Sequence, residues 1–172
     1  MQRFIGGVLV LVATTGAGIA YGRELQKYLE KLMDIRQIVY LLKGEITYSG
    51  APLYEVLERV SLRVKEPYQR WLREMRWQIE ERTTDEFLKI WSQSIDDYLA
   101  ELHLKNIHMR QLKELGMWFG QLDIQTADRT LQLYLSRLEQ EIELVRVGIV
   151  GKKRIGNCLG VMGGIFLVVM LI

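Results

Sequence analysis

The feature that most constrains this chain is an uncharged run at its C-terminal end. Residues 155–172 carry no charge and directly follow three basic residues, Lys-Lys-Arg, at 152–154. At a rise of about 1.5 Å per residue the run makes about 27 Å of helix, which nearly matches a hydrocarbon core of roughly 30 Å. We therefore predict a transmembrane helix over 155–172, with the chain ending in or just beyond the membrane.

A second uncharged run repeats this plan in reverse near the N-terminus. Residues 4–22 contain no charge and lie between Arg3 and Arg23. The sequence thus predicts a first transmembrane helix over 1–22 and one polar domain over 23–154. A domain of this length can bury a modest core of its own.

The charge of this middle domain is nearly balanced. Of the 23 Lys and Arg residues only Arg3 lies outside it, so 22 basic residues stand against all 21 acidic ones. The balance argues against a nucleic-acid-binding domain, which would carry a basic face. Many Leu, Glu, Lys, Arg and Gln residues with only two prolines favour an all-α fold.

Positive charge lies on the domain side of both predicted spans. Arg23, Lys27 and Lys31 follow the first span and the basic residues 152–154 precede the second, whereas only Arg3 lies on the other side. The positive-inside rule therefore predicts a cytoplasmic domain, with both termini across the membrane.

A cleaved signal peptide is the alternative interpretation. Arg3, the apolar run after it and the small residues Gly18 and Ala20 fit a cleavage pattern. The protein would then be an extracytoplasmic, tail-anchored helical binding or sensor module.

Both predicted spans carry small residues at intervals of four. Small residues let helix backbones approach closely in lipid, which favours packing of the spans on each other or on another protein, although Gly is also common in membrane helices. The positions are Gly18 and Gly22 in the first span, and Gly156, Gly160 and Gly164 in the second.

Two segments of the domain carry narrow apolar seams of the coiled-coil type. One covers 23–48 and ends at a Ser-Gly-Ala-Pro stretch, and the other begins near Thr126. Steps of three and four alternate in both. The seam positions are Leu25, Tyr28, Leu32, Ile35, Val39, Leu42 and Ile46 in the first, and Leu131, Leu135, Leu138, Ile142, Val145 and Ile149 in the second.

Four shorter helices are predicted between the seamed ones. We expect the seamed helices to pair antiparallel as a stalk and the four others to close its far end. The fold class is then an all-α bundle of about six helices between two transmembrane helices. The first two are expected over 52–66 and 67–82. The third is expected to start after a capping box of Thr83 with Glu86, and the fourth is expected over 107–119.

The chain carries no motif of a catalytic, cofactor-binding or metal-binding site. Gly148 and Gly151 are too close together for a phosphate loop, and His103 and His108 are five residues apart, so a helix does not bring them to one face. We expect these histidines to be loop and surface residues. The one cysteine, Cys158, lies in the last apolar run. We therefore predict a protein that is not an enzyme and uses no cofactor.

Residues 45–53, Glu-Ile-Thr-Tyr-Ser-Gly-Ala-Pro-Leu, resemble the E-I-x-Y-x-x-x-P-L segment of the stage III sporulation protein AB family of endospore-forming bacteria. The resemblance continues in order through the first span, the family's F-G-x-x-L-G-x-x-D element at 115–123, and the entry to the last span. It departs at four positions. Leu115 stands where the family has Phe, and Phe119 stands where it has Leu. Met117 stands where the family often has an acid, and Ala127 stands where it often has Gln.

This resemblance implies a non-enzymatic membrane platform in the channel between mother cell and forespore. The family is similar to the inner-membrane platform protein of type II secretion and type IV pilus machines. It implies a place in the mother-cell (outer forespore) membrane, with a cytoplasmic export-type ATPase and other channel subunits as partners. Formation of a homo-oligomer is left open.

The 116–123 part of that element also has a local interpretation. Gly116 and Gly120 lie four apart at a helix end, where they allow a close helix approach followed by a turn. Asp123 is placed to accept backbone N–H groups at the start of the next helix. We expect a tight helix–helix corner here, with a partner-binding surface as the alternative.

Overall fold

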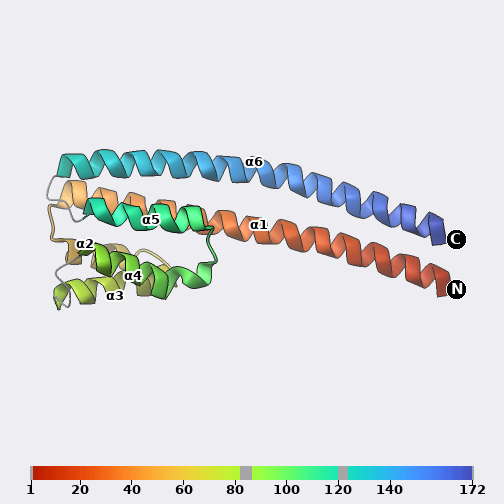
Figure 1. The fold of residues 1–172 in the computed structure, drawn as a ribbon, viewed down its shortest axis with the longest axis horizontal. Helices are drawn as coiled ribbons and strands as arrows, with labels where there is room; N and C mark the ends of the chain where they lie inside the picture. Colours follow the sequence, from red (N-terminus) through yellow and green to blue (C-terminus); the bar gives the residue numbers. More distant parts are fainter. Residues whose placement is uncertain (1, 82–86, 120–123, 172) are drawn as a thin grey trace. The chain divides into compact units, whose positions relative to one another are not determined.

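The computed structural model describes residues 2–81, 87–119 and 124–171, and all regular structure within them is helical (Figure 1). This confirms the prediction of an all-α chain with six α-helices and no strand for the described residues. The elements are α1 (Gln2–Ser49), α2 (Leu53–Ser61), α3 (Tyr68–Glu80), α4 (Phe87–Leu99), a 3₁₀ helix (Ala100–Leu102), α5 (Asn106–Phe119) and α6 (Ile124–Leu171).

The helix ends differ from the sequence predictions in two ways. Most shorter helices begin and end within two residues of their expected bounds, but α2 ends at Ser61, five residues before the end expected for it. The larger difference is that α1 begins at Gln2 and α6 ends at Leu171. Each seamed helix is therefore continuous with the adjoining apolar run. The expected capping box of Thr83 and Glu86 lies outside the described residues.

The chain divides into two compact units. One comprises Met33–Glu139, and the other comprises Met1–Leu32 with Gln140–Ile172. In the second unit the two helical segments lie side by side, and Leu32 and Ile142 are buried (Figure 1).

No helix in the described part of the chain combines the length and the apolar character that a bilayer crossing requires. The two spans over 1–22 and 155–172 stay predictions from the sequence.

The core of the unit Met33–Glu139 is built by one apolar face of each helix. In this unit α2 packs on α3, α3 on α4, and α4 on α5. The seam positions predicted within this unit are buried, except that Ile46 is partly exposed. The fully buried large side chains include Trp71, Trp91, Tyr68, Ile38, Leu42, Leu57, Leu72, Met75, Ile95, Leu99 and Leu112.

Ion pairs fix the relative direction of α1 and α6 within this unit. Arg36 binds Glu139 at 3.0 Å, Lys43 binds Asp128 at 3.4 Å, and the Thr47 hydroxyl donates to Asp128 at 3.0 Å. Residue numbers rise along α1 while those of the partners fall along α6. The two helices therefore run antiparallel over these residues, in the direction expected from their seams.

The two histidines have different environments. His103 is exposed at the end of the 3₁₀ helix, with a left-handed φ of 49°. His108 is only 5% exposed, so the expectation that both histidines are loop and surface residues was wrong for His108. It lies in the first turn of α5, on the side that faces the core, and the five-residue spacing gave no sign of this.

Candidate interaction site at the corner between α1 and α2

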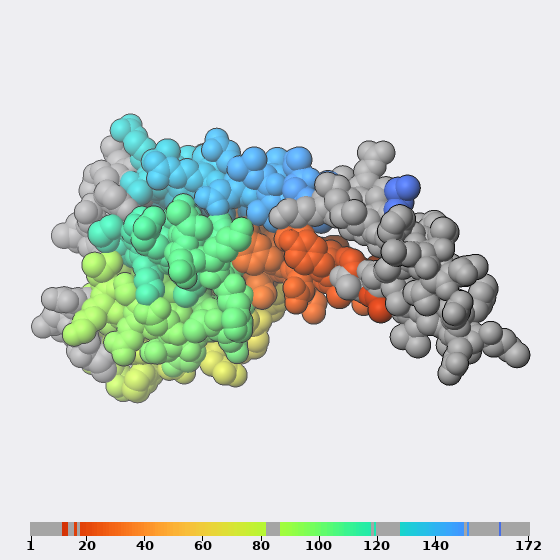
Figure 2. All heavy atoms as spheres, turned by 45° about the vertical axis from the view of Figure 1, so that its right-hand side comes forward, coloured from red at the N-terminus to blue at the C-terminus, as the bar shows by residue number. Residues whose placement is uncertain are grey.

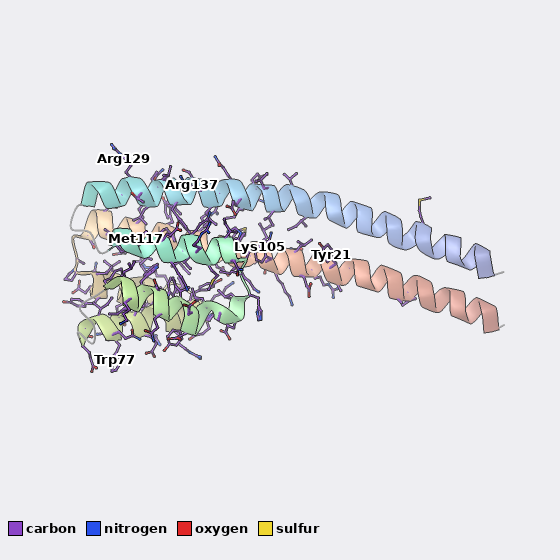
Figure 3. The ribbon with its side chains drawn as sticks, in the orientation of Figure 1. Tyr21, Trp77, Lys105, Met117, Arg129 and Arg137 are labelled. Carbon is purple, nitrogen blue, oxygen red and sulfur yellow. The ribbon has the colours of Figure 1, made fainter. Side chains whose placement is uncertain are left out.

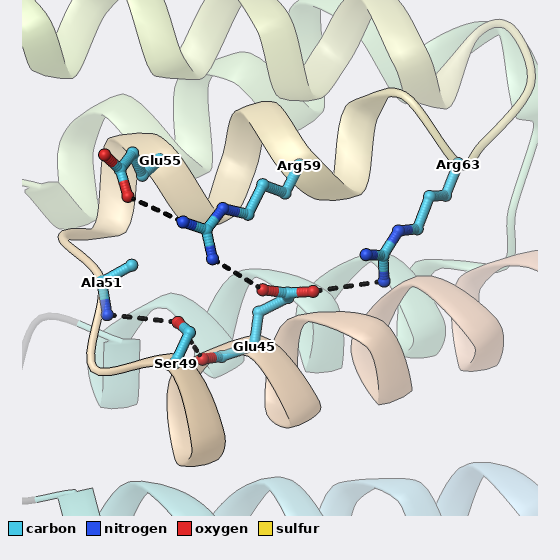
Figure 4. A network of polar contacts seen from close by, with 6 residues as sticks. All are labelled: Glu45, Ser49, Ala51, Glu55, Arg59 and Arg63. Atoms are coloured by element: carbon cyan, nitrogen blue, oxygen red, sulfur yellow. Dashed lines mark hydrogen bonds and ion pairs between the residues drawn. The ribbon is translucent and has the colours of Figure 1, made fainter.

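The corner between α1 and α2 begins where Ser49 ends the first helix (Figure 4). The Ser49 hydroxyl donates to the Glu45 carbonyl at 2.6 Å and accepts the Ala51 N–H at 3.1 Å. Gly50 follows with φ +59°, a left-handed conformation that glycine adopts without a Cβ penalty. The helix was expected to stop at this stretch, and the structure confirms it.

Pro52 is the N-cap residue of α2. Its carbonyl accepts the N–H groups of Glu55 at 3.0 Å and Val56 at 3.1 Å, which closes the first turn. Proline suits this position because its missing N–H would have no helical partner there. The local sequence thus reverses the chain within a few residues and lays α2 against the end of α1.

Glu45 is the centre of an ion-pair cluster at this corner. Its carboxylate binds Arg59 at 3.4 Å and Arg63 at 3.2 Å, and Arg59 also binds Glu55 at 3.1 Å (Figure 4). The Glu45 side chain is only 15% exposed, whereas both arginines are about half exposed. The cluster is neutral as a whole, with two carboxylates and two guanidinium groups. It fixes α2 on α1 while leaving polar atoms of the arginines at the surface.

A small hollow continues from this cluster along α1. It has a volume of about 190 Å³ and is lined by Arg63, Lys65, Asp34 and Tyr68, among others. Lys65 binds Asp34 at 3.0 Å across it. Burial raises the pKa of the Tyr68 phenol well above its ordinary value near 10, and the negative charge of Asp34 raises it further. Tyr68 therefore stays neutral in the folded protein.

Gly116 lies against the indole of Trp91. A Cβ at this position would be 2.3 Å from Trp91 Cδ1, which is closer than any real side chain allows. The contact joins α5 to α4 and is a close helix approach of the kind considered for this glycine. The other two residues of that expected corner, Gly120 and Asp123, lie outside the described residues.

Trp91 is held in place by a hydrogen bond and by an aromatic cluster. Its indole N–H donates to the Leu112 carbonyl at 2.8 Å. Its ring packs on Trp71 and Phe119 with centroid distances of 5.2 and 5.0 Å. Buried Ser94 accepts from the Trp71 indole at 3.0 Å and donates to the Trp91 carbonyl at 2.9 Å. Apolar periodicity placed both tryptophans inward but could not show that they meet.

The glycines expected to pack in the membrane can be placed only in part. Gly18 and Gly22 lie in α1, and a Cβ at Gly22 would have no atom within 4 Å. Gly156, Gly160 and Gly164 fall within the bounds of α6, but their surroundings lie outside the described residues. Among the described residues no group of His, Cys, Asp and Glu is arranged to hold a metal ion.

Comparison with known proteins gives the family. The sequence profile of stage III sporulation protein AB matches residues 3–172. The chain belongs to the stage III sporulation protein AB family. It is similar to the stage III sporulation protein AB of Bacillus subtilis (strain 168), with 24% identity over 172 residues that cover 99% of each chain.

A solved structure in the stage III sporulation protein AB family supports the fold. That protein is 20% identical and superposes with a TM-score of 0.65, covering 72% of this chain and 97% of its own. The family segment that first gave the resemblance, residues 45–53, is the corner described above, from the carboxylate of Glu45 to the first residue of α2. The sequence indicated the arginines of this cluster less clearly, because Glu55 and Arg59 are spaced as an ordinary i,i+4 pair on one helix.

Proposed function

We propose that this protein is a non-enzymatic membrane platform subunit of the channel between mother cell and forespore. In this proposal it is anchored in the mother-cell (outer forespore) membrane by helices over 1–22 and 155–172. Its helical domain faces the cytoplasm, where it docks an export-type ATPase and other channel subunits.

The observation that carries the proposal is the extent of the family match. The profile covers residues 3–172, so it includes both apolar ends as well as the helical unit between them. The distribution of Arg23, Lys27, Lys31 and residues 152–154 supports a cytoplasmic domain.

Cysteine labelling tests the orientation in intact non-sporulating cells that express the protein, because their cell membrane has one face open to the medium, whereas a membrane inside the mother cell does not. Single cysteines replace Gln93, which is exposed on α4, and Ile172, both in a Cys158→Ala background. A membrane-impermeant maleimide is expected to label the cysteine at 172 and to leave the one at 93 unlabelled until the cells are permeabilised. Labelling at 93 in intact cells would place the domain outside and would favour the alternative of a tail-anchored module after signal cleavage.

Co-purification tests the docking part of the proposal. Affinity-tagged full-length protein is solubilised in mild detergent from sporulating cells, and bound proteins are identified by mass spectrometry. We expect an export-type ATPase to be retained with this protein and not with an unrelated tagged membrane protein. Its loss under conditions in which the chain stays folded would argue against a platform that docks an ATPase.

A further inference from the structure

The outer face of α6 within the unit Met33–Glu139 carries an exposed leucine between two arginines. Arg129, Leu133 and Arg137 are spaced by four residues, so they follow one side of the helix. Figure 3 labels the two arginines on α6. This side is opposite the one that buries Leu131 and Leu138 in the core. Leu133 is 52% exposed, and Figure 2 shows this stretch of α6, in cyan, at the surface. We call these three residues the α6 ridge.

The charged residues of α6 over 128–139 leave the ridge with a net positive charge. The two acidic residues of this stretch, Asp128 and Glu139, each bind a basic residue of α1. Neither Arg129 nor Arg137 forms an ion pair with any residue that the structure describes. The uncompensated charge is therefore two guanidinium groups, about 12 Å apart along the helix.

Hollows flank the ridge on both sides. One has a volume of about 800 Å³ and is lined by Arg129, by Thr47 of α1 and by Leu133. The other is smaller, about 90 Å³, and is lined by Arg137, by Glu114 of α5 and again by Leu133. Leu133 thus forms the crest between two depressions, each with one of the arginines at its edge. An incoming helix can pack over Leu133 with its side chains in the hollows on either side.

We propose that the α6 ridge docks a helix of a partner protein that carries two carboxylates two turns apart with an apolar residue between them. Arginine binds carboxylates through paired N–H groups, so the two arginines fix the register of such a helix. Burying Leu133 against the apolar residue adds affinity that ion pairs alone do not supply. The proposal rests on the proposed function, because it names the surface at which the platform takes a cytoplasmic partner.

An acidic protein fits this surface better than a phosphate polyanion does. The domain over 23–154 is nearly neutral. Phosphate binding relies on a net positive surface over several contacts, which the balanced domain does not offer. An apolar crest between the arginines also has no counterpart in a nucleic-acid backbone.

Photocrosslinking in the full-length protein tests the proposal. A photoreactive benzoyl-phenylalanine replaces Leu133, and a second variant carries it instead of Leu88, an exposed leucine on α4. After irradiation of sporulating cells, the crosslinked peptides are mapped by mass spectrometry. We expect an adduct from position 133 whose partner segment is helical and has carboxylates on both sides of the crosslinked residue, and a much weaker adduct with that segment from position 88.

Charge reversal then separates recognition from folding. The double variant Arg129→Glu/Arg137→Glu is expected to lower the adduct yield about tenfold, since close interfacial charge pairs set affinity and like charges repel. Its matched control is Arg73→Glu/Lys89→Glu, which reverses two exposed charges on α3 and α4 and should leave the yield unchanged. Lysines in place of the two mapped carboxylates of the partner should restore the adduct of the charge-reversed double variant, which a folding defect would not allow.

Two results would overturn the proposal. One is an adduct yield at position 133 that the double reversal leaves unchanged, and the other is a mapped segment without carboxylates, including an adduct with nucleic acid or lipid. The proposed function fails separately, because it requires the ATPase to co-purify with the unsubstituted protein. If the ATPase is retained equally by the reversed and unsubstituted proteins, the platform stands and the α6 ridge is not its docking surface.

Discussion

At the residue scale, Gly116 has the least room for a side chain among the described glycines. A methyl group there would lie 2.3 Å from Trp91 Cδ1. The indole cannot move aside, because it is 1% exposed and its N–H is bound to the Leu112 carbonyl. We expect Gly116→Ala to destabilise the full-length protein by about 1–3 kcal/mol, the usual cost of overpacking a core. Thermal unfolding in detergent, followed by circular dichroism, measures this.

Gly44→Ala is the matched control for that substitution. Gly44 also lies inside a helix, but a Cβ there would have no atom within 4 Å. Alanine should leave stability unchanged or raise it by about 0.5–1 kcal/mol, because glycine loses more backbone freedom on folding. Equal effects at 116 and 44 would mean that helix propensity, rather than the contact with Trp91, decides the outcome.

Glu45 and Arg63 should be coupled in their effects on stability. Their side chains are 3.2 Å apart, and Glu45 is the more buried partner. In a double-mutant cycle of Glu45→Ala and Arg63→Ala we expect a coupling energy of about 0.5–1 kcal/mol, near the upper end for ion pairs that are partly exposed. The same cycle with Lys89 in place of Arg63 should give no coupling. A value near zero for both cycles would show that the cluster at the corner is not energetically significant.

Tyr68 should make the protein sensitive to alkali. Burial holds the pKa of its phenol above the ordinary value near 10, so above that pH the unfolded chain loses a proton that the folded chain keeps. Stability then falls as pH rises, by up to about 1.4 kcal/mol per pH unit from this group. Tyr68→Phe should remove that part of the slope between pH 10 and 11, measured by denaturant unfolding. An unchanged slope would mean that other groups cause the alkaline loss.

At the element scale, the apolar seams allowed much of the fold to be predicted. Leu32, Ile35, Val39 and Leu42 are all buried, because a helix that packs on one side must repeat its apolar residues every three or four positions. The seam positions Leu25, Tyr28, Ile46, Val145 and Ile149 are only partly buried.

Contacts between elements could not be predicted in the same way. Periodicity shows which face of a helix is buried but not which partner covers it, so the meeting of Trp71 with Trp91 and the two arginines on Glu45 appeared only in the structure. His108 was missed because a polar residue on an apolar face has no periodic signal of its own. Gly50 was the opposite case, since its left-handed turn follows from local chemistry alone.

The pairing of α1 with α6 can be tested by its register. The Lys43 ammonium donates to the Gln132 side-chain carbonyl, and Lys43 also binds Asp128. In a Cys158→Ala background, cysteines at 43 and 132 should be joined rapidly by a short bismaleimide. Cysteines at 43 and 139 should react far more slowly, because the antiparallel register places Glu139 beside Arg36, about two turns away along α1. Mass spectrometry of the intact protein measures the crosslink. Faster reaction of the 43–139 pair would contradict this register.

At the scale of the whole molecule, the family could be predicted from short motifs spread along the chain, and the profile match over 3–172 shows it. No single motif had to be decisive, since four stretches agreed in order from the first apolar run to the last. The charge pattern added an orientation, which depends on the membrane and so has no counterpart in the contacts of the folded chain.

The last prediction concerns the glycines expected to pack in the membrane. If Gly156, Gly160 and Gly164 form a close-packing face in lipid, Gly160→Leu separates the helices that meet there, because a large side chain prevents close backbone approach. Complementation of a strain that lacks its own family member should then show a sporulation frequency reduced about tenfold or more, as expected for a loss of roughly 1.4 kcal/mol in association. Gly151→Leu is the control, since a Cβ at Gly151 would meet no atom within 4 Å. Full sporulation with Gly160→Leu, at normal protein levels in the membrane, would show that these glycines reflect the composition of a span and not an interface.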